Sequence, residues 1–191
     1  MPFFRRLSPI VASLLLVAAL ALPAAAGPKK VYLVNGLFSK AFGYGLTNLS
    51  KKIPYARHFK FSGAVTSAAI NGIIQDAARA YKNDPTTEIS LVGISQGANA
   101  ITRIAAALDK QGVRVHYVAA IEGGTMTPLP SNVTKADSFI CNGGDCARKT
   151  VRLATGNTTT RTAVFELDAG HIASGNDARM HSRVISQINS G

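Results

Sequence analysis

Tryptophan is absent from this chain of 191 residues, and its other aromatic residues are five tyrosines and eight phenylalanines. A carbohydrate-binding surface depends on broad aromatic rings against which a sugar can stack. The scarcity of such rings argues against a carbohydrate-stacking platform.

Acidic residues are also scarce, because ten aspartates and glutamates stand against 21 lysines and arginines, for a net charge of +11. Such a balance favours anionic surfaces or polymers as partners. The basic residues are scattered, however, and no run mixes aromatic and basic residues as a nucleic-acid groove requires. We therefore interpret the charge as solvated surface and expect no nucleic-acid partner.

The only cysteines are Cys141 and Cys146, which are five positions apart. Two thiolates alone make a poor zinc site, because structural zinc is held by a larger set of protein ligands. In an oxidising compartment a small disulfide loop is expected instead. We predict a Cys141–Cys146 disulfide and no bound metal.

Long apolar runs are confined to the start of the chain, where Ile10 to Leu22 follow Arg5 and Arg6 and precede Ala24 to Ala26. A basic start, a short apolar run and small residues predict a secretory signal peptide over residues 1–26. No later stretch is long enough to cross a bilayer. Residues 27–191 are then expected to form one exported domain, periplasmic or secreted, without a stable membrane span and of unknown oligomeric state.

Strand-like and helix-like segments alternate along this domain. The predicted strands are Val31–Val34, Ala56–Phe61, Glu88–Val92, Val113–Ile121, Ser138–Cys141 and Ala163–Leu167. The predicted helices are Gly45–Ile53, Ser67–Tyr81, Ala98–Leu108 and Met180–Ile188, the last beginning near Asp177, and Gly123–Lys135 is predicted as a loop. The alternation predicts an α/β fold, a three-layer sandwich with a mostly parallel sheet of about six strands and helices on both faces. No repeat indicates a second domain.

A GxSxG motif, Gly93 to Gly97, stands between a predicted strand and a predicted helix. That order is typical of a nucleophile elbow, a tight turn that exposes a serine at the edge of a sheet. The two glycines leave room for the turn. Ser95 is therefore the predicted nucleophile.

A serine hydroxyl needs a base within hydrogen-bond reach, and histidine is the usual base. His171 follows Gly170 after the last predicted strand, where a side chain can reach back to Ser95. His58 and His116 lie in predicted strands and are expected to be structural, and His181 is expected to be solvated on the last helix. We predict His171 as the base.

The oxyanion of a tetrahedral intermediate requires two backbone donors. The amide of Gln96, directly after the nucleophile, is one candidate. The other is expected in the glycine turn after the first strand, where Leu37 or Phe38 follows Asn35 and Gly36.

With these motifs the chain resembles a small member of the alpha/beta-hydrolase superfamily, similar to lipase-like and esterase-like proteins with little or no lid. The resemblance covers most of residues 30–189 and includes the family's order of serine, acid and histidine. The chain differs at Asn35, where many relatives have a histidine before the oxyanion glycine. Substrate positioning at that residue is therefore open, whereas the backbone donors are retained.

The resemblance also implies a carboxylate that orients the histidine. Glu122 ends the strand after the elbow helix, as the acid does in some lipases, and is our first candidate. Asp145 follows the next strand, the commoner location in the superfamily, and is the alternative. Asp168 lies close to His171 in sequence, and Asp137 is placed at the start of a strand, away from the site.

These residues predict an exported serine hydrolase that cleaves a carboxylic ester or thioester through an acyl-enzyme and needs no cofactor. Its substrate is expected to be a small-molecule or lipid-like acyl ester. The alternative is a non-catalytic binding protein on the same scaffold, because a fold does not determine a function.

Overall fold

The computed structural model describes residues 27–37, 39–42 and 45–190. Among these residues the strands are β1 (Lys29–Val34), β2 (Arg57–Phe59), β3 (Glu88–Ile94), β4 (Val115–Ile121), β5 (Val133–Cys141) and β6 (Arg161–Leu167). The helices are α1 (Ser39–Phe42), α2 (Thr47–Lys52), α3 (Ser67–Asn83), α4 (Gln96–Asp109) and α5 (Ala178–Asn189), with a 3₁₀ helix η1 (Ala173–Asn176).

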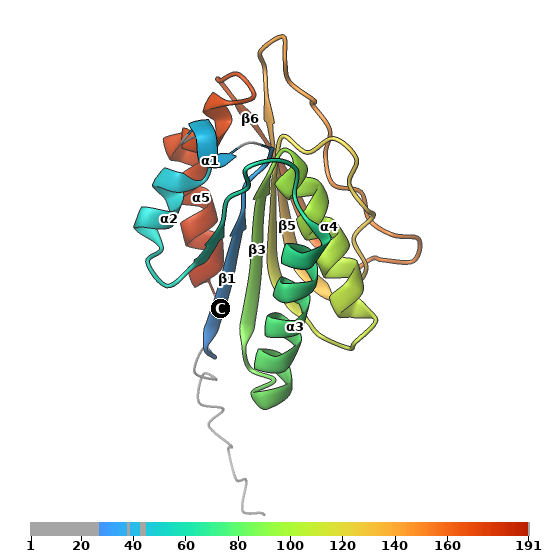
Figure 1. Ribbon diagram of the computed structural model, residues 1–191. Coiled ribbons are helices and arrows are strands. Elements are labelled where there is room, and N and C mark those ends of the chain that lie inside the picture. The colour runs from blue at the N-terminus through green and yellow to red at the C-terminus, as the bar shows by residue number, and fades with distance from the viewer. Residues whose placement is uncertain (1–26, 38, 43–44, 191) are drawn as a thin grey trace, which may run out of the picture.

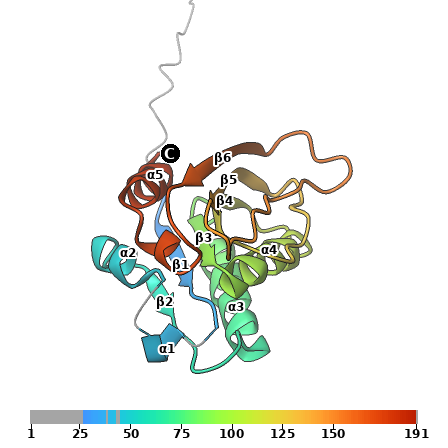
Figure 2. The ribbon, with the colours of Figure 1, turned by 90° about the horizontal axis from the view of Figure 1, so that it is seen from above.

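The six strands form one sheet in the order β2-β1-β3-β4-β5-β6, and every neighbouring pair is parallel. Helices α3 and α4 cover one face of the sheet, and α2 and α5 cover the other (Figures 1 and 2). The chain therefore forms the predicted three-layer α/β sandwich, and its carboxyl strand ends all lie at one edge of the sheet.

Each face of the sheet has its own apolar core. On one face Ile73 of α3 and Ile104 of α4 pack against strand residues such as Leu91. On the other face Val184 of α5 packs in a cluster with Val92 and other strand residues. Because β3 is buried on both faces, it reads in the sequence as a nearly continuous apolar run, as central parallel strands do.

Side chains cap the helices that border the core. The hydroxyl of Thr66 accepts a hydrogen bond from the amide of Ala69 at the start of α3. The carboxylate of Asp177 accepts one from the amide of Met180 at the start of α5. These N-caps explain why both helices begin where polar residues precede an apolar face.

The prediction of a loop over Gly123–Lys135 is wrong at its end, because β5 already begins at Val133. Val133 is buried in the core, and the strand is buried again from Ala136 to Phe139. Asp137 consequently lies inside β5 rather than at its start. There it is buried and accepts hydrogen bonds from the Tyr117 hydroxyl at 2.9 Å and from Arg183 Nε at 2.8 Å.

The prediction of a solvated His181 is also wrong. Its ring is buried on the inner face of α5, where Nε2 lies 2.8 Å from the carbonyl oxygen of Gly175 and Nδ1 lies 3.2 Å from Lys52 Nζ. Burial lowers the pKa of His181, and so does the Lys52 charge. His181 thus links η1, α2 and α5.

No helix in the described part of the chain has the length and apolar character of a membrane span. The predicted signal peptide, residues 1–26, lies outside the described residues.

Candidate active site

The predicted site residues meet at the edge formed by the carboxyl ends of the strands, which Figure 2 views from above. Ser95 follows β3, Glu122 follows β4, and His171 comes after β6. Parallel strands bring these ends together although the residues are far apart in sequence, which is why this edge is the usual ligand-binding edge of an open α/β sheet.

Ser95 stands at the turn between β3 and α4 with φ 56° and ψ −122°, a backbone conformation that residues other than glycine rarely adopt. A methyl group on Gly93 would lie 2.4 Å from the carbonyl oxygen of Gly97. A methyl group on Gly97 would lie 1.9 Å from the carbonyl oxygen of Val34 in β1. Glycine is thus required at both positions for the turn to close over the sheet.

The loop after β1 passes close to Ser95. A methyl group on Gly36 would lie 2.9 Å from Ser95 Cβ and 3.3 Å from its Oγ, so only glycine lets this backbone approach the serine. Asn35, which replaces the histidine of many superfamily members, is fully buried, and its Oδ1 accepts a hydrogen bond of 2.8 Å from the amide of Leu46. Asn35 therefore ties the loop after β1 to the segment that leads into α2.

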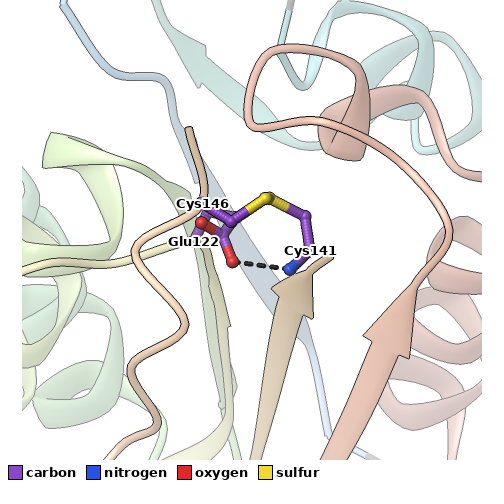
Figure 3. Close-up of side chains that lie close together, drawn as sticks. All are labelled: Glu122, Cys141 and Cys146. Carbon is purple, nitrogen blue, oxygen red and sulfur yellow. Dashed lines mark hydrogen bonds between the residues drawn. A yellow bond between two sulfur atoms is a disulfide. The ribbon is translucent and has the colours of Figure 1, made fainter. Parts of the chain in front are cut away.

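Glu122 directly follows β4, with φ 48°, and is 1% exposed. Its Oε1 accepts a hydrogen bond from the amide of Cys141, and its Oε2 accepts one from the amide of Ala147, each at 2.6 Å. Figure 3 shows the first of these bonds, at the end of β5. Two backbone donors compensate the burial of this carboxylate and fix its orientation.

His171 contacts both candidate acids, but in different ways. Its ring nitrogen Nδ1 lies 3.4 Å from Glu122 Oε2. Its backbone amide donates a hydrogen bond of 3.2 Å to Asp145 Oδ1. The structure therefore places Glu122 at the imidazole and Asp145 at the main chain of the same residue. Asp168 accepts a hydrogen bond from the side chain of Asn142 instead.

Cys141 and Cys146 are joined by a disulfide that lies beside the Glu122 carboxylate (Figure 3). The two sulfurs and a Glu122 oxygen lie within 4.8 Å of one another, a spacing that would suit a metal ion if the thiols were free. Because the sulfurs are bonded to each other, they are not thiolate ligands. The disulfide closes a loop that begins at Cys141, one of the two amide donors to Glu122, and ends at Cys146, one residue before the other donor, Ala147.

Ser95 and His171 line the same pocket, which has a volume of about 230 Å³. Its other walls include Gly36, Leu37, Ile94 and Ile172, and Leu37 and Ile172 are partly open to solvent. The pocket is thus largely apolar, and its polar lining consists of Asn35, the serines Ser39 and Ser95, and the imidazole of His171. Such a pocket, apolar with a few polar groups, is typical of small-molecule sites.

The predicted oxyanion donors are Gln96 and either Leu37 or Phe38. Gln96 is the first residue of α4, directly after Ser95, and its side chain accepts a hydrogen bond of 3.4 Å from the amide of Val65. Leu37 lines the pocket. Phe38 lies outside the described residues.

The remaining histidines have pKa values displaced from the usual range. Burial, together with the nearby charge of Lys60, lowers the pKa of His58 to about 4. Burial also lowers the pKa of His116, whose Nε2 lies 3.1 Å from the carbonyl oxygen of Gln187. Neither residue lines the Ser95 pocket.

Sequence reasoning missed Ala147 and Asn35 as parts of this site. The amide of Ala147 reaches Glu122 across 25 positions of the chain, and a backbone contact leaves no mark in side-chain composition. Asn35 stood out only as a departure from the usual histidine, a signal that does not predict its bond to Leu46.

The sequence matches no protein-family model and none of the curated proteins. Solved structures with similar folds do exist. The thioesterase domain that cyclises the lipopeptide antibiotic surfactin superposes with a TM-score of 0.55 at 13% identity, over 86% of this chain and 93% of that one.

A serine hydrolase without a lid from Xanthomonas campestris superposes with a TM-score of 0.53 at 13% identity, over 86% of this chain and 82% of its own. Human thioesterase 2 superposes with a TM-score of 0.53 at 8% identity, over 85% of this chain and 94% of its own. The chain therefore has the fold of the alpha/beta-hydrolase superfamily.

Proposed function

We propose that the chain is an exported serine hydrolase that cleaves a carboxylic ester or thioester through an acyl-enzyme. One observation carries the proposal: the imidazole of His171 lies 3.4 Å from the buried carboxylate of Glu122 and lines the same pocket as Ser95. Ser95, His171 and Glu122 lie at one edge of the sheet, and we assign them the roles of nucleophile, base and orienting acid. That is the arrangement that activates a serine hydroxyl.

In the first half-reaction Ser95 Oγ attacks the substrate carbonyl and its proton passes to His171. A carboxylate at Nδ1 favours the tautomer that carries hydrogen on Nδ1, so Nε2 is the basic nitrogen. Glu122 stabilises the imidazolium that forms. His171 then donates the proton to the departing alcohol or thiol, and an ester of Ser95 remains.

In the second half-reaction a water molecule attacks the acyl-serine. His171 accepts a proton from the water and returns one to Ser95 Oγ as the carboxylic acid leaves. The backbone amides of Gln96 and of Leu37 or Phe38 are proposed to bind the oxyanion of both tetrahedral intermediates. The close approach of Gly36 to Ser95 supports this assignment, because it brings the loop after β1 against the nucleophile.

The lining of the pocket supports an acyl ester as the substrate. A volume of about 230 Å³ with apolar walls accommodates a short acyl chain more readily than a long one. Thioesterases are among the proteins of similar fold, so the thioester alternative is retained.

Export is proposed from the sequence pattern of residues 1–26. A disulfide agrees with an oxidising compartment, periplasmic or extracellular. N-terminal sequencing of the full chain after expression in a bacterial host should yield Gly27 as the first residue. An unprocessed chain in the cytosol would contradict export.

A panel of p-nitrophenyl esters of increasing acyl length tests the hydrolase directly. The wild type should hydrolyse the short esters, and Ser95→Ala should lose a factor of at least about 10⁴ in kcat. Ser182→Ala, on the exposed side of α5, is the matched control and should retain activity. Equal turnover by the wild type and Ser95→Ala would end the proposal, and no turnover of any ester would favour the non-catalytic binding protein.

A further inference from the structure

A second hollow, of about 500 Å³, lies between two segments that leave the same edge of the sheet. One wall is formed by residues 124–126, which begin two positions after Glu122, and the other by residues 148–150 and 152, which begin directly after Ala147. Nothing in the proposed mechanism uses this hollow, which we call the basic cleft.

Hydrogen bonds join the two walls of the basic cleft at both ends. At one end Glu122 Oε2 accepts the hydrogen bond from Ala147. At the other end Leu129 pairs with Leu153 in a parallel bridge, in which the Leu129 amide donates to the Arg152 carbonyl oxygen at 2.8 Å. The basic cleft is therefore a built feature that separates two fixed segments.

A third anchor fixes which side chains face the basic cleft. The amide of Val151 donates a hydrogen bond of 3.0 Å to Ser138 Oγ in β5, and the Val151 side chain packs against the core. Its neighbours Thr150 and Arg152 are exposed and line the basic cleft. Arg148 has φ 50°, so the chain turns sharply where it enters this wall.

The basic cleft has a strongly positive lining. Arg148, Lys149 and Arg152 all contribute to it, and it contains no acidic residue. Arg148 donates a hydrogen bond of 2.7 Å to the carbonyl oxygen of Asn142. The side chains of Lys149 and Arg152 form no hydrogen bond or ion pair with any described residue, so both remain available to a ligand.

The basic cleft and the Ser95 pocket share no lining residue, but α4 and Glu122 link them. The amide of Gly124 donates a hydrogen bond of 2.9 Å to Asn99 Oδ1, and Asn99 lies one helical turn after Ser95 in α4. Glu122 connects the two sites, because it binds His171 on one side and precedes the 124–126 wall on the other. Both sites therefore lie at the carboxyl edge of the sheet, and the inference below requires a substrate that reaches from Ser95 to the cations.

The geometry points to a subsite in the basic cleft that binds a carboxylate or phosphate group of the substrate, away from the scissile carbonyl. Guanidinium and ammonium groups bind such oxyanions through charge-assisted hydrogen bonds. This inference rests on the proposed function and narrows its substrate class to esters or thioesters that carry an anionic group.

Paired substrates that differ by one charge test the subsite. The monoesters of p-nitrophenol with succinate and adipate are compared with p-nitrophenyl butyrate and hexanoate, which replace the free carboxylate by a methyl group. The butyrate esters of 4-hydroxybenzoate and of phenol place the charge on the leaving group instead. In at least one of these series the wild type should have the higher kcat/KM for the anionic member.

The variant Lys149→Ala/Arg152→Ala should lower the ratio of anionic to neutral kcat/KM by about tenfold, chiefly through KM. The control Lys110→Ala/Arg114→Ala removes the same charge from exposed positions beyond the far end of α4 and should keep the wild-type ratio. A wild type without anionic preference in any series, or a Lys149/Arg152 variant that keeps the preference, would overturn the subsite.

Binding of inorganic pyrophosphate, measured by calorimetry, separates this inference from the proposed function. Saturable binding by the wild type and the Lys110/Arg114 control, but about tenfold weaker binding by the Lys149/Arg152 variant, supports the subsite even if no ester is hydrolysed. The absence of binding, or equal binding by all three proteins, counts against the subsite even if esters are hydrolysed.

Discussion

Three side chains of unequal exposure carry the proposed chemistry. Glu122 is almost completely buried, whereas His171 is partly exposed at the mouth of the pocket with Ser95. Burial suits the orienting acid, because a fixed carboxylate holds the imidazole in one tautomer. Partial exposure suits the base and the nucleophile, which must meet substrate and water.

The assignment of the acid leads to a prediction at the scale of single residues. Glu122→Gln should lower kcat by about 10² to 10⁴, because an amide cannot stabilise the imidazolium as a carboxylate does. The substitution should also reduce the free energy of unfolding by about 1 to 3 kcal/mol. The new side-chain NH₂ group cannot accept a hydrogen bond, so one of the two backbone amides that bind Glu122 would lose its acceptor. Steady-state kinetics and urea unfolding measure both effects.

Asp145→Asn is the matched control. The Asp145 carboxylate binds the backbone amide of His171, whereas the Glu122 carboxylate lies at the His171 ring. It should lower kcat by less than about tenfold. The reverse order of effects would show that Asp145 is the acid and that our assignment of Glu122 is wrong.

At the scale of elements, the elbow depends on close contact between β1, β3 and α4. Gly97→Ala would push a methyl group into the carbonyl oxygen of Val34, at 1.9 Å. We expect a loss of more than about 3 kcal/mol in the free energy of unfolding, measured in urea.

Gly72→Ala provides the contrast, because a methyl group there meets no atom within 4 Å on the surface of α3. It should stabilise the protein by about 0.5 to 1 kcal/mol, since alanine has the higher helix propensity. If Gly97→Ala were as stable as Gly72→Ala, the account of the elbow would fail.

The disulfide loop is the second element on which the site depends. Its closure holds Cys141 and Ala147, whose amides bind Glu122, and Asp145, which binds the main chain of His171. The double variant Cys141→Ser/Cys146→Ser should therefore lower kcat by about tenfold, and it should raise KM by a smaller factor. The loss of loop constraint should also cost about 2 kcal/mol of stability.

Kinetics and urea unfolding of the double serine variant check both effects. Treatment of the wild type with a reductant should reproduce them, and it should leave the double variant unchanged. Full kcat in the reduced protein would show that the loop does not position the site.

At the scale of the whole molecule, three buried or half-buried histidines make the fold sensitive to acid. Burial lowers the pKa of His58 from 6.5 to about 4 in the folded protein, so the unfolded chain binds the proton more tightly. Its contribution to stability is complete above about pH 6.5 and is lost as the pH falls toward 4. Burial shifts the pKa values of His116 and His181 in the same direction.

His58→Phe should therefore lose less stability than the wild type between neutral pH and about pH 5. We expect the difference to be about 1 kcal/mol, a value reduced for the partial exposure of the side chain. Urea unfolding at the two pH values measures it. A steeper acid loss in the variant would contradict the sign of the pKa shift.

Most of the fold could be predicted from the sequence, because buried parallel strands such as β3 and amphipathic helices such as α3 have strong local patterns. The GxSxG motif and the position of His171 also led to two side chains that line one pocket. The start of β5, the burial of His181 and the Ala147 contact could not be predicted. Each depends on tertiary packing between distant segments, for which a single sequence has no local pattern.

The central claim is that Ser95 is a nucleophile activated by His171 and Glu122. Peptide mass spectrometry after treatment with a serine-directed phosphonate tests it most directly. The account predicts a single covalent adduct on the peptide that contains Ser95, with no adduct in Ser95→Ala and a much slower reaction in His171→Ala. A wild-type protein that forms no adduct with any of several phosphonates, or an adduct that persists in Ser95→Ala, would contradict it.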